Sequence, residues 1–151
     1  MSEERLPSLL SGLSSGEYSI SKTFPATIEE FPNVIAFFEE TLTEYGASFK
    51  VITQMNIIAE ELFTNVAKFA YKDSTGYCQI DIEKLDGSIK VRFIDNGGMF
   101  NPLEKEDPDI STGADEREIG GLGILMVKKM SDQIEYSYQS NCNILTLVKN
   151  L

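Results

Sequence analysis

The sequence predicts the α/β (α+β) class, as a two-layer sandwich in which three helices cover one face of a mostly antiparallel, mixed sheet. Its length of 151 residues is enough for one hydrophobic core and short for two, which favours a single domain. Periodic patterns follow one another as strand, two helices, hairpin, long irregular segment, helix and hairpin. Strands joined as hairpins pair antiparallel, and three amphipathic helices suffice to cover one face of a sheet.

Composition argues against several classes of function. The formal charge is −11, from 24 acidic and 13 basic residues, which disfavours broad attachment to nucleic acid or to an anionic membrane. We therefore expect no direct nucleic-acid partner and no membrane partner, and any phosphate must be held locally. The sequence has no histidine, so Ser-His-Asp catalysis, phosphohistidine and histidine metal ligands are excluded. No segment approaches the roughly 20 apolar residues of a membrane helix, and we expect a cytoplasmic protein.

The chain begins with a segment that carries little pattern. Residues 1–16 are rich in Ser and Gly and are expected to form a flexible tail, which leaves 17–151 as the domain. Tyr18–Phe24 then alternates roughly as a strand does, and Pro25 closes it.

A first helix is predicted after this strand. Thr27 and Glu30 form a capping-box pattern, Pro32 falls in the first turn, and Gly46 ends the helix. Its apolar stripe consists of Phe31, Val34, Ile35, Phe38 and Leu42.

The longest periodic segment predicts a second helix over Phe49–Tyr71, capped by Ser48. Two strands follow at Tyr77–Leu85 and Ser88–Asp95. Asp86-Gly87 between them is the strongest short signal for a tight hairpin. The two cysteines, Cys78 and Cys142, fall in predicted strands, where buried free thiols are expected.

A long irregular stretch covers Asn96–Glu118 and contains seven acidic side chains: Glu104, Glu106, Asp107, Asp109, Asp115, Glu116 and Glu118. Its length favours a lid over a ligand. A glycine-rich helix over 120–130 follows, and then two strands at Gln133–Tyr138 and Asn143–Lys149 around a turn near Ser140-Asn141.

Three polar residues of the long helix form the first candidate site. Glu61, Asn65 and Lys68 are spaced so that they project from nearly the same helical face. Such a set suits a magnesium nucleotide, because an amide oxygen is a hard metal ligand, an ammonium group meets phosphate and a carboxylate can act as a base. The alternative is an exposed polar face with a hydrogen bond between residues four apart.

The second candidate is Asp95, which ends an apolar strand and precedes Asn96-Gly97-Gly98. A carboxylate in this place can accept a hydrogen bond from an exocyclic amine, and glycines let another group approach the backbone. A surface turn is the alternative.

The third candidate is a set of three glycines, Gly120, Gly121 and Gly123, which precede the apolar pattern of Ile124–Met130. The amides at a helix N-terminus bind anions such as nucleotide phosphate when no side chains block them. Close packing of the helix on a neighbour would explain the glycines equally well.

These segments, in this order, resemble the Bergerat-fold (GHKL, HATPase_c) ATPases, and most closely their anti-sigma-factor serine/threonine kinase branch. The resemblance runs over roughly residues 18–149. It rests on EELFTNVAKFAY (60–71) as the N box, DNGGMF (95–100) as the first glycine box and GGLGILMVKKMSDQIEY (120–136) as the second.

The resemblance implies a role for each motif. Asn65 would coordinate Mg²⁺, and Glu61 would activate the attacking hydroxyl group. Asp95 would bind the adenine amino group, with Gly97 allowing the base to approach. The second glycine box would offer backbone amides to the phosphates of ATP from Gly121, Leu122 and Gly123.

The chain also departs from the family pattern. Anti-sigma kinases commonly have His-Ala-Tyr at the end of the N box, where this chain has Phe69-Ala70-Tyr71, and Lys68-Phe69 is similar to the form found in sensor histidine kinases. Histidine autophosphorylation is excluded because the chain has no histidine. Family kinases use a lid arginine near the transferred phosphate, and Arg117 is the only arginine of the expected lid.

By resemblance, the protein is expected to be a serine/threonine protein kinase that uses ATP and Mg²⁺. Its substrate would be an anti-sigma-factor antagonist with a STAS-type domain, it would sequester a sigma factor, and it would form a homodimer. An ATP-regulated protein-binding module without kinase activity is the alternative. A third possibility is an interaction domain that binds no nucleotide.

Overall fold

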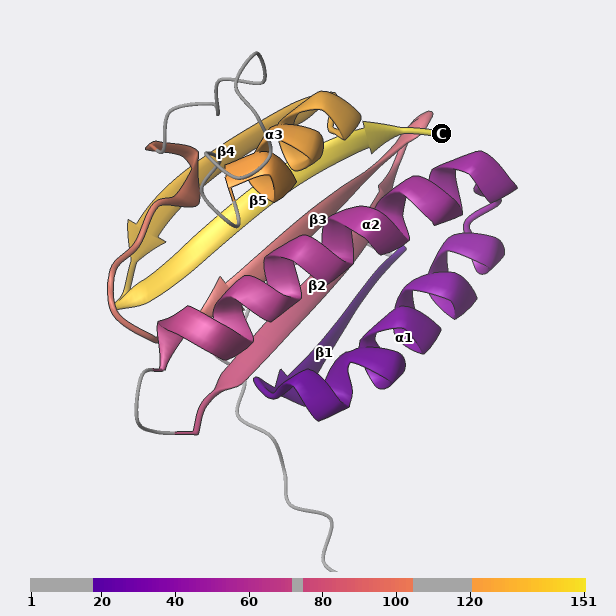
Figure 1. Cartoon of the computed structure of the whole chain (residues 1–151). Coiled ribbons are helices and arrows are strands. Elements are labelled where there is room, and N and C mark those ends of the chain that lie inside the picture. Colours follow the sequence, from indigo (N-terminus) through magenta and orange to yellow (C-terminus); the bar gives the residue numbers. More distant parts are fainter. Residues whose placement is uncertain (1–17, 72–74, 105–120) are drawn as a thin grey trace, which may run out of the picture.

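The structure is a computed structural model that describes residues 18–71, 75–104 and 121–151. Its described part contains a five-stranded sheet in the order β1-β2-β3-β5-β4. The strands are β1 Ser19–Pro25, β2 Tyr77–Leu85, β3 Ser88–Asp95, β4 Gln133–Gln139 and β5 Cys142–Asn150. Three α-helices, α1 Phe31–Glu44, α2 Phe49–Asn65 and α3 Gly121–Met130, lie over one face of the sheet (Figure 1).

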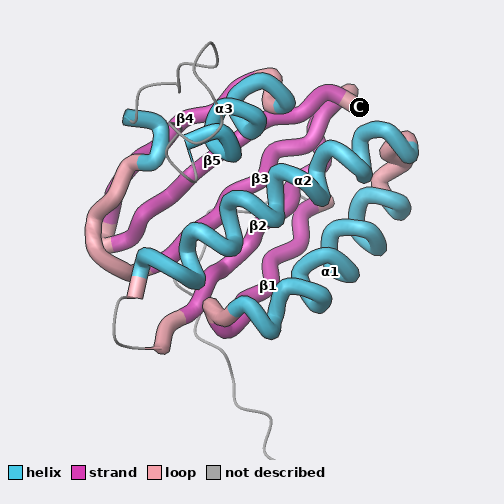
Figure 2. Tube along the Cα trace, viewed as in Figure 1, coloured by secondary structure: helices cyan, strands magenta, loops and turns pink. Residues whose placement is uncertain are grey.

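This arrangement confirms the two-layer α+β sandwich. All four strand pairings of the described residues are antiparallel, so the parallel component expected in a mixed sheet is not found among them. α2 lies between α1 and α3 and runs along the middle of the sheet (Figure 2). The helix that carries the N box therefore has a neighbour on each side.

Both predicted hairpins are present with two-residue turns. Leu85 pairs with Ser88, and Gly87 has a φ of 76°, which a residue without Cβ adopts at little cost. The β4–β5 turn places Ser140 and Asn141 at φ values of 53° and 61°. Two successive left-handed residues are the geometry of a type I′ turn, whose twist matches that of the flanking strands.

The first helix begins later than the capping-box pattern predicts. Thr27 is extended but accepts no side-chain hydrogen bond as a cap, Ile28–Glu30 form a 3₁₀ turn (η1), and α1 starts at Phe31. Pro32 explains the difference. In an α-helix that starts after Thr27, Pro32 would lie beyond the first turn and would remove an internal hydrogen bond, whereas as the second residue of α1 it removes none.

The second helix has the predicted cap but a different end. Val51 N–H donates to Ser48 Oγ at 3.2 Å, which confirms Ser48 as the N-cap. The α-helix ends at Asn65, and the chain continues as a π-helix, η2 Val66–Ala70. The predicted helix over 49–71 is therefore helical nearly throughout, but its last turn is wider than an α-helical turn.

The core lies between the helices and the sheet and is rich in phenylalanine. Phe24, Phe38 and Phe63 are fully buried, and the rings of Phe38 and Phe93 stack at 6.0 Å between centroids. Cys78 and Cys142 are buried free thiols, as expected. Within the described ranges, no helix has the length and apolar character needed to cross a bilayer.

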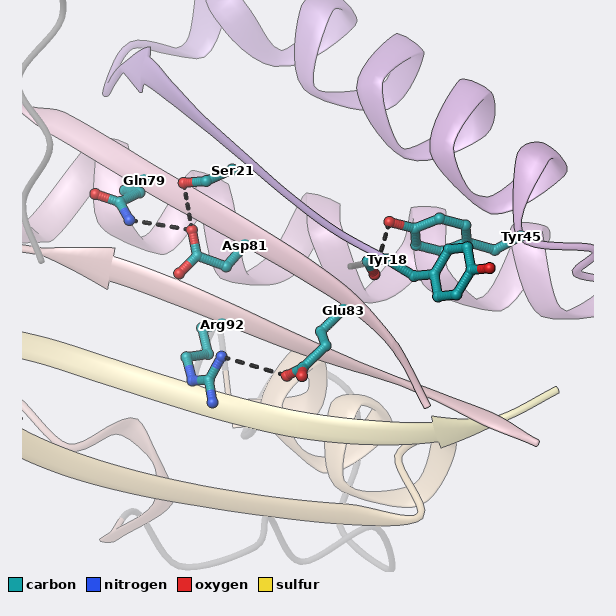
Figure 3. A network of polar contacts seen from close by, with 7 residues as sticks. All are labelled: Tyr18, Ser21, Tyr45, Gln79, Asp81, Glu83 and Arg92. Carbon is teal, nitrogen blue, oxygen red and sulfur yellow. Dashed lines mark hydrogen bonds and ion pairs between the residues drawn. The ribbon is translucent and has the colours of Figure 1, made fainter. Parts of the chain in front are cut away.

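Alternate residues of β2 point to opposite sides of the sheet, as the pleat requires. Ile80 and Ile82 join the core, while Asp81 and Gln79 lie on the side away from the helices, where Gln79 Nε2 donates to Asp81 Oδ1 at 3.0 Å (Figure 3). Ser21 Oγ of β1 donates to the same oxygen. This polar network is separate from the sites predicted from the motifs.

Replacing Phe38 by alanine should lower the free energy of unfolding by about 3–5 kcal/mol, because it leaves a cavity in the centre of the core. The same change at Phe49, whose side chain is 85% exposed, should cost less than about 0.5 kcal/mol. Urea unfolding followed by circular dichroism would measure both. Equal costs for the two variants would contradict the core as described.

Candidate functional site

Glu61 and Asn65 lie one turn apart on α2 and interact directly. Asn65 Nδ2 donates to Glu61 Oε2 at 3.0 Å, and both side chains are partly buried. This contact is the hydrogen bond between residues four apart that is also expected if the motif is only a polar helix face without a ligand. It also orients the amide of Asn65, whose Oδ1 accepts no hydrogen bond from the described residues. An amide oxygen of this kind is a suitable ligand for a hard cation.

The first turn of α3 contacts Glu61. A Cβ atom on Gly123 would overlap with the carboxylate of Glu61, so a side chain at this position would force the carboxylate to move away. Close packing, one of the two explanations for the glycines, therefore holds at Gly123. α3 begins at Gly121, so Gly121, Leu122 and Gly123 belong to its first turn. The first amides of a helix have no partner within the helix and are available to an anion.

A second close approach joins the loop after β3 to the end of α2. A Cβ atom on Gly97 would overlap with the backbone carbonyl of Ala70, and Gly98 N–H donates to the same carbonyl at 3.2 Å. In the described residues, the group that approaches Gly97 is thus the backbone of η2. This close approach brings the end of β3 next to the end of α2, so that Asp95 and Asn65 line the same cavity.

Asp95 is buried at the end of β3, with 6% of its surface exposed. Its Oδ1 accepts hydrogen bonds from Gly97 N–H at 3.0 Å and from Asn143 Nδ2 at 2.9 Å. Burial raises the pKa of Asp95, and these two hydrogen bonds act against the rise because they stabilise the ionised form. Oδ2 accepts no hydrogen bond from the described residues, which leaves it as an acceptor for a ligand.

Asp95 and Asn65 line one cavity between α2, η2, β3, β4 and β5. Its remaining lining is largely apolar and aromatic: Leu62, Val66, Phe69, Ala70, Phe93, Gly98, Phe100, Pro102, Tyr136, Asn143 and Leu145. An apolar cavity with a few polar groups at its wall is the usual form of a small-molecule site. A flat base with an exocyclic amine has the right chemistry for it.

The structure brings some of the predicted site residues together and leaves others apart. Lys68 lies in η2, where the wider turn alters the direction in which a residue three positions after Asn65 projects. The side chain of Lys68 is exposed and does not line the cavity. Gly120 and Arg117 lie outside the described residues, as does most of the expected lid. The described beginning of that segment forms a short 3₁₀ turn, η3 Pro102–Glu104.

Two contributors to the site were missed from sequence. Asn143 of β5 holds Asp95, and the only signal for it is an asparagine between the apolar residues Cys142 and Ile144 of that strand. Tyr71 lies at the end of the N box. Its hydroxyl is 2.7 Å from Asn96 Oδ1 and accepts from Asn96 N–H at 3.0 Å. Burial raises the pKa of Tyr71 to about 12, so the hydroxyl keeps its proton even in alkaline solution up to about pH 11.

Gly97→Ala should lower the free energy of unfolding by about 1–3 kcal/mol, because the added methyl group meets a backbone carbonyl that cannot rotate away. Gly98→Ala is the matched control, since a Cβ atom there would meet nothing within 4 Å. It should leave stability within about 1 kcal/mol of the parent. Thermal and urea unfolding would compare them, and equal losses would contradict the close approach at Gly97.

The chain is similar to known proteins over most of its length. The family model described as "Histidine kinase-like ATPase domain" matches residues 24–149. The chain is 25% identical over 105 residues to the serine-protein kinase RsbW of Listeria monocytogenes, covering 66% of this chain and 67% of that protein. It is 27% identical over 138 residues to the serine-protein kinase RsbW of Staphylococcus aureus, covering 87% of each.

A solved structure has the same fold. The RsbU and RsbW domains of Rv1364c from Mycobacterium tuberculosis align with a TM-score of 0.64 at 20% identity, over 88% of this chain and 32% of that one. The chain thus spans about a third of the length of that protein. The resemblance to the anti-sigma-factor kinase branch of the Bergerat-fold ATPases is confirmed, and the chain belongs to the histidine kinase-like ATPase domain family.

Proposed function

We propose that the protein binds Mg-ATP and transfers the γ-phosphoryl group to a serine or threonine of a partner protein. One observation carries this proposal: the carboxylate of Glu61 lies between the amide of Asn65 and the first turn of α3. The proposed base, the proposed metal ligand and amides that have no partner within their own helix are thus close together. The names of the similar serine-protein kinases from Listeria and Staphylococcus support the reaction class.

The residues present fit a magnesium nucleotide. Asn65 Oδ1 would hold Mg²⁺, which when bound would neutralise charge on the phosphates. The first-turn amides of Gly121, Leu122 and Gly123 would donate to phosphate oxygens, together with Gly120 just before the helix. Asp95 would accept a hydrogen bond from the adenine amino group, with Gly97 beside it.

In the transfer itself, the hydroxyl oxygen of the substrate bonds to the γ-phosphorus while the bond to the β,γ-bridging oxygen breaks, and ADP leaves. Glu61 takes the hydroxyl proton, and the hydrogen bond from Asn65 holds its carboxylate in place. The exposed Lys68 would meet phosphate from the rim of the site, and Arg117 would do so from the segment over it.

The proposed partners come from the family resemblance. The phosphorylated protein would be a STAS-type anti-sigma-factor antagonist, and the kinase would sequester a sigma factor until the antagonist displaces it. We propose that it acts in the cytoplasm as a homodimer, with residues 17–151 as the ATP-binding kinase-like domain and 1–16 as a tail outside it.

A second candidate is an ATP-regulated binding module without kinase activity. It is favoured by Phe69, which stands where the related kinases commonly have histidine and which is 63% exposed beside the cavity. The two candidates differ in whether phosphate is transferred, since a binding module forms a stoichiometric complex with its partner without phosphorylating it.

Glu61→Gln should reduce phosphate transfer at least about 100-fold, because the amide cannot take the hydroxyl proton. ATP affinity should stay within about threefold, since the glutamine oxygen still accepts the hydrogen bond from Asn65. Transfer of radiolabelled phosphate to a STAS-type protein and equilibrium binding of ATP would measure the two quantities.

Glu60→Gln is the matched control, because Glu60 precedes Glu61 on α2 and its side chain is exposed. It should leave both quantities unchanged. If Glu61→Gln transfers phosphate at the parent rate, Glu61 is not the base. Stoichiometric partner binding without transfer in the parent protein would favour the binding module.

A further inference from the structure

We propose that Asn143 is the positioning residue that makes the cavity select a base with an exocyclic amine over one with a carbonyl group in its place. This inference rests on the proposed nucleotide binding. The inference adds to the proposed nucleotide binding by assigning the selectivity for the base to a residue that need not touch the ligand. The strand register brings Asn143 of β5 directly opposite Asp95 of β3.

The side-chain amide of Asn143 has all of its hydrogen-bonding capacity in use. Nδ2 donates to Asp95 Oδ1 at 2.9 Å and to the carbonyl of Gly98 at 2.9 Å. Oδ1 accepts from Phe100 N–H at 3.0 Å and from the hydroxyl of Tyr136. An amide has two donor hydrogens and two acceptor positions, so none remains for a ligand.

The partners also determine which way the amide faces. A backbone N–H can only donate, so the Phe100 end must meet the oxygen. The Gly98 carbonyl can only accept, so the other end must be the nitrogen, and that same nitrogen faces Asp95. Rotation of the amide by half a turn would break the hydrogen bonds with Phe100, Gly98 and the ionised Asp95, and only the Tyr136 hydroxyl could adapt by accepting in place of donating.

This orientation controls the chemistry that Asp95 presents. A donor fixed against Oδ1 stabilises the ionised carboxylate, which is otherwise disfavoured by burial. An ionised carboxylate only accepts hydrogen bonds. It can therefore bind an amine, whereas a carbonyl group beside it would leave two buried acceptors facing each other.

Asn143 at the same time fixes the cavity wall around Asp95. It holds Gly98 and Phe100 of the loop after β3, and Tyr136 of the neighbouring strand β4. Gly98, Phe100 and Tyr136 all line the cavity. One side chain thus joins three parts of the wall and orients the carboxylate between them.

The test compares two nucleotides that differ at the proposed contact. ATP carries an amine at position 6 of the purine, and inosine triphosphate carries a carbonyl group there. The dissociation constant of each with Mg²⁺ would be measured by calorimetry for the full chain. The parent should prefer ATP by at least about tenfold, which is what one hydrogen bond to a charged group is worth.

Asn143→Ala should reduce this preference by about tenfold, while the affinity for inosine triphosphate changes less than about twofold. A merely structural role would weaken both nucleotides equally and leave the ratio intact. Asn150→Ala is the matched control, since it makes the same change at the exposed end of the same strand and should not alter either affinity.

Circular dichroism and thermal melting would show which variants fold. If Asn143→Ala does not fold, Asn143→Ser takes its place, because its hydroxyl keeps one donor and fills part of the space. It should lower the preference for ATP by about threefold. In an Asp95→Asn background, removal of Asn143 should leave the ratio unchanged, because its effect passes through Asp95.

The outcomes separate this inference from the function on which it rests. A parent protein that binds neither nucleotide overturns the proposed function and the inference with it. A parent that prefers ATP, with the preference intact in a folded Asn143 variant, overturns the inference alone. Equal binding of ATP and inosine triphosphate by the parent also overturns the inference and leaves nucleotide binding standing.

Discussion

The candidate site depends on how closely the C-terminal half of α2 approaches its neighbours. Two positions without side chains make this possible: Gly123 lets the first turn of α3 meet Glu61, and Gly97 lets the loop after β3 meet the carbonyl of Ala70. A methyl group at either position would overlap with α2 or η2. At Gly97 the overlap is with a backbone carbonyl, which cannot be relieved without moving η2 or the loop, whereas at Gly123 the carboxylate of Glu61 would have to move away from α3. Both glycine boxes therefore have a structural role beside the one proposed for ligand binding.

The second constraint is the burial of a carboxylate. Asp95 is nearly inaccessible, and an ionised group in such a place needs donors that are held in position. The donors come from Gly97, two residues away, and from Asn143, which is 48 residues further along the chain. Tyr71 and Asn96 tie the end of the N box to the same loop. The polar groups of the cavity wall are thus held by β3, β5 and the end of η2 together.

Much of the fold could be predicted because its signals are local. The strands β2 and β3 have the predicted bounds, since Asp86-Gly87 favours only a tight turn. Ser48 caps α2 for the same reason, because its hydroxyl reaches an amide three residues away. The predicted start of α1 was wrong because two local signals compete, the capping-box pattern at Thr27 and the proline at position 32. The ring of Pro32 determines where an α-helix can begin. The π-turn of η2 escaped prediction because apolar spacing does not distinguish it from an α-helical turn.

The sequence by itself determined the class of fold, the order of its elements, the absence of histidine chemistry, and the motifs that carry Glu61, Asn65 and Asp95. These properties depend on residue types and on short spacings. Only the tertiary structure decided that Gly123 packs on Glu61, that Lys68 stays outside the cavity and that Asn143 holds Asp95. The contact of Asn143 depends on the register of β3 with β5, that of Gly123 on the distance between α2 and α3, and the position of Lys68 on the wider turn of η2. Such quantities arise only when the whole core packs, because residues far apart in the chain are then placed side by side.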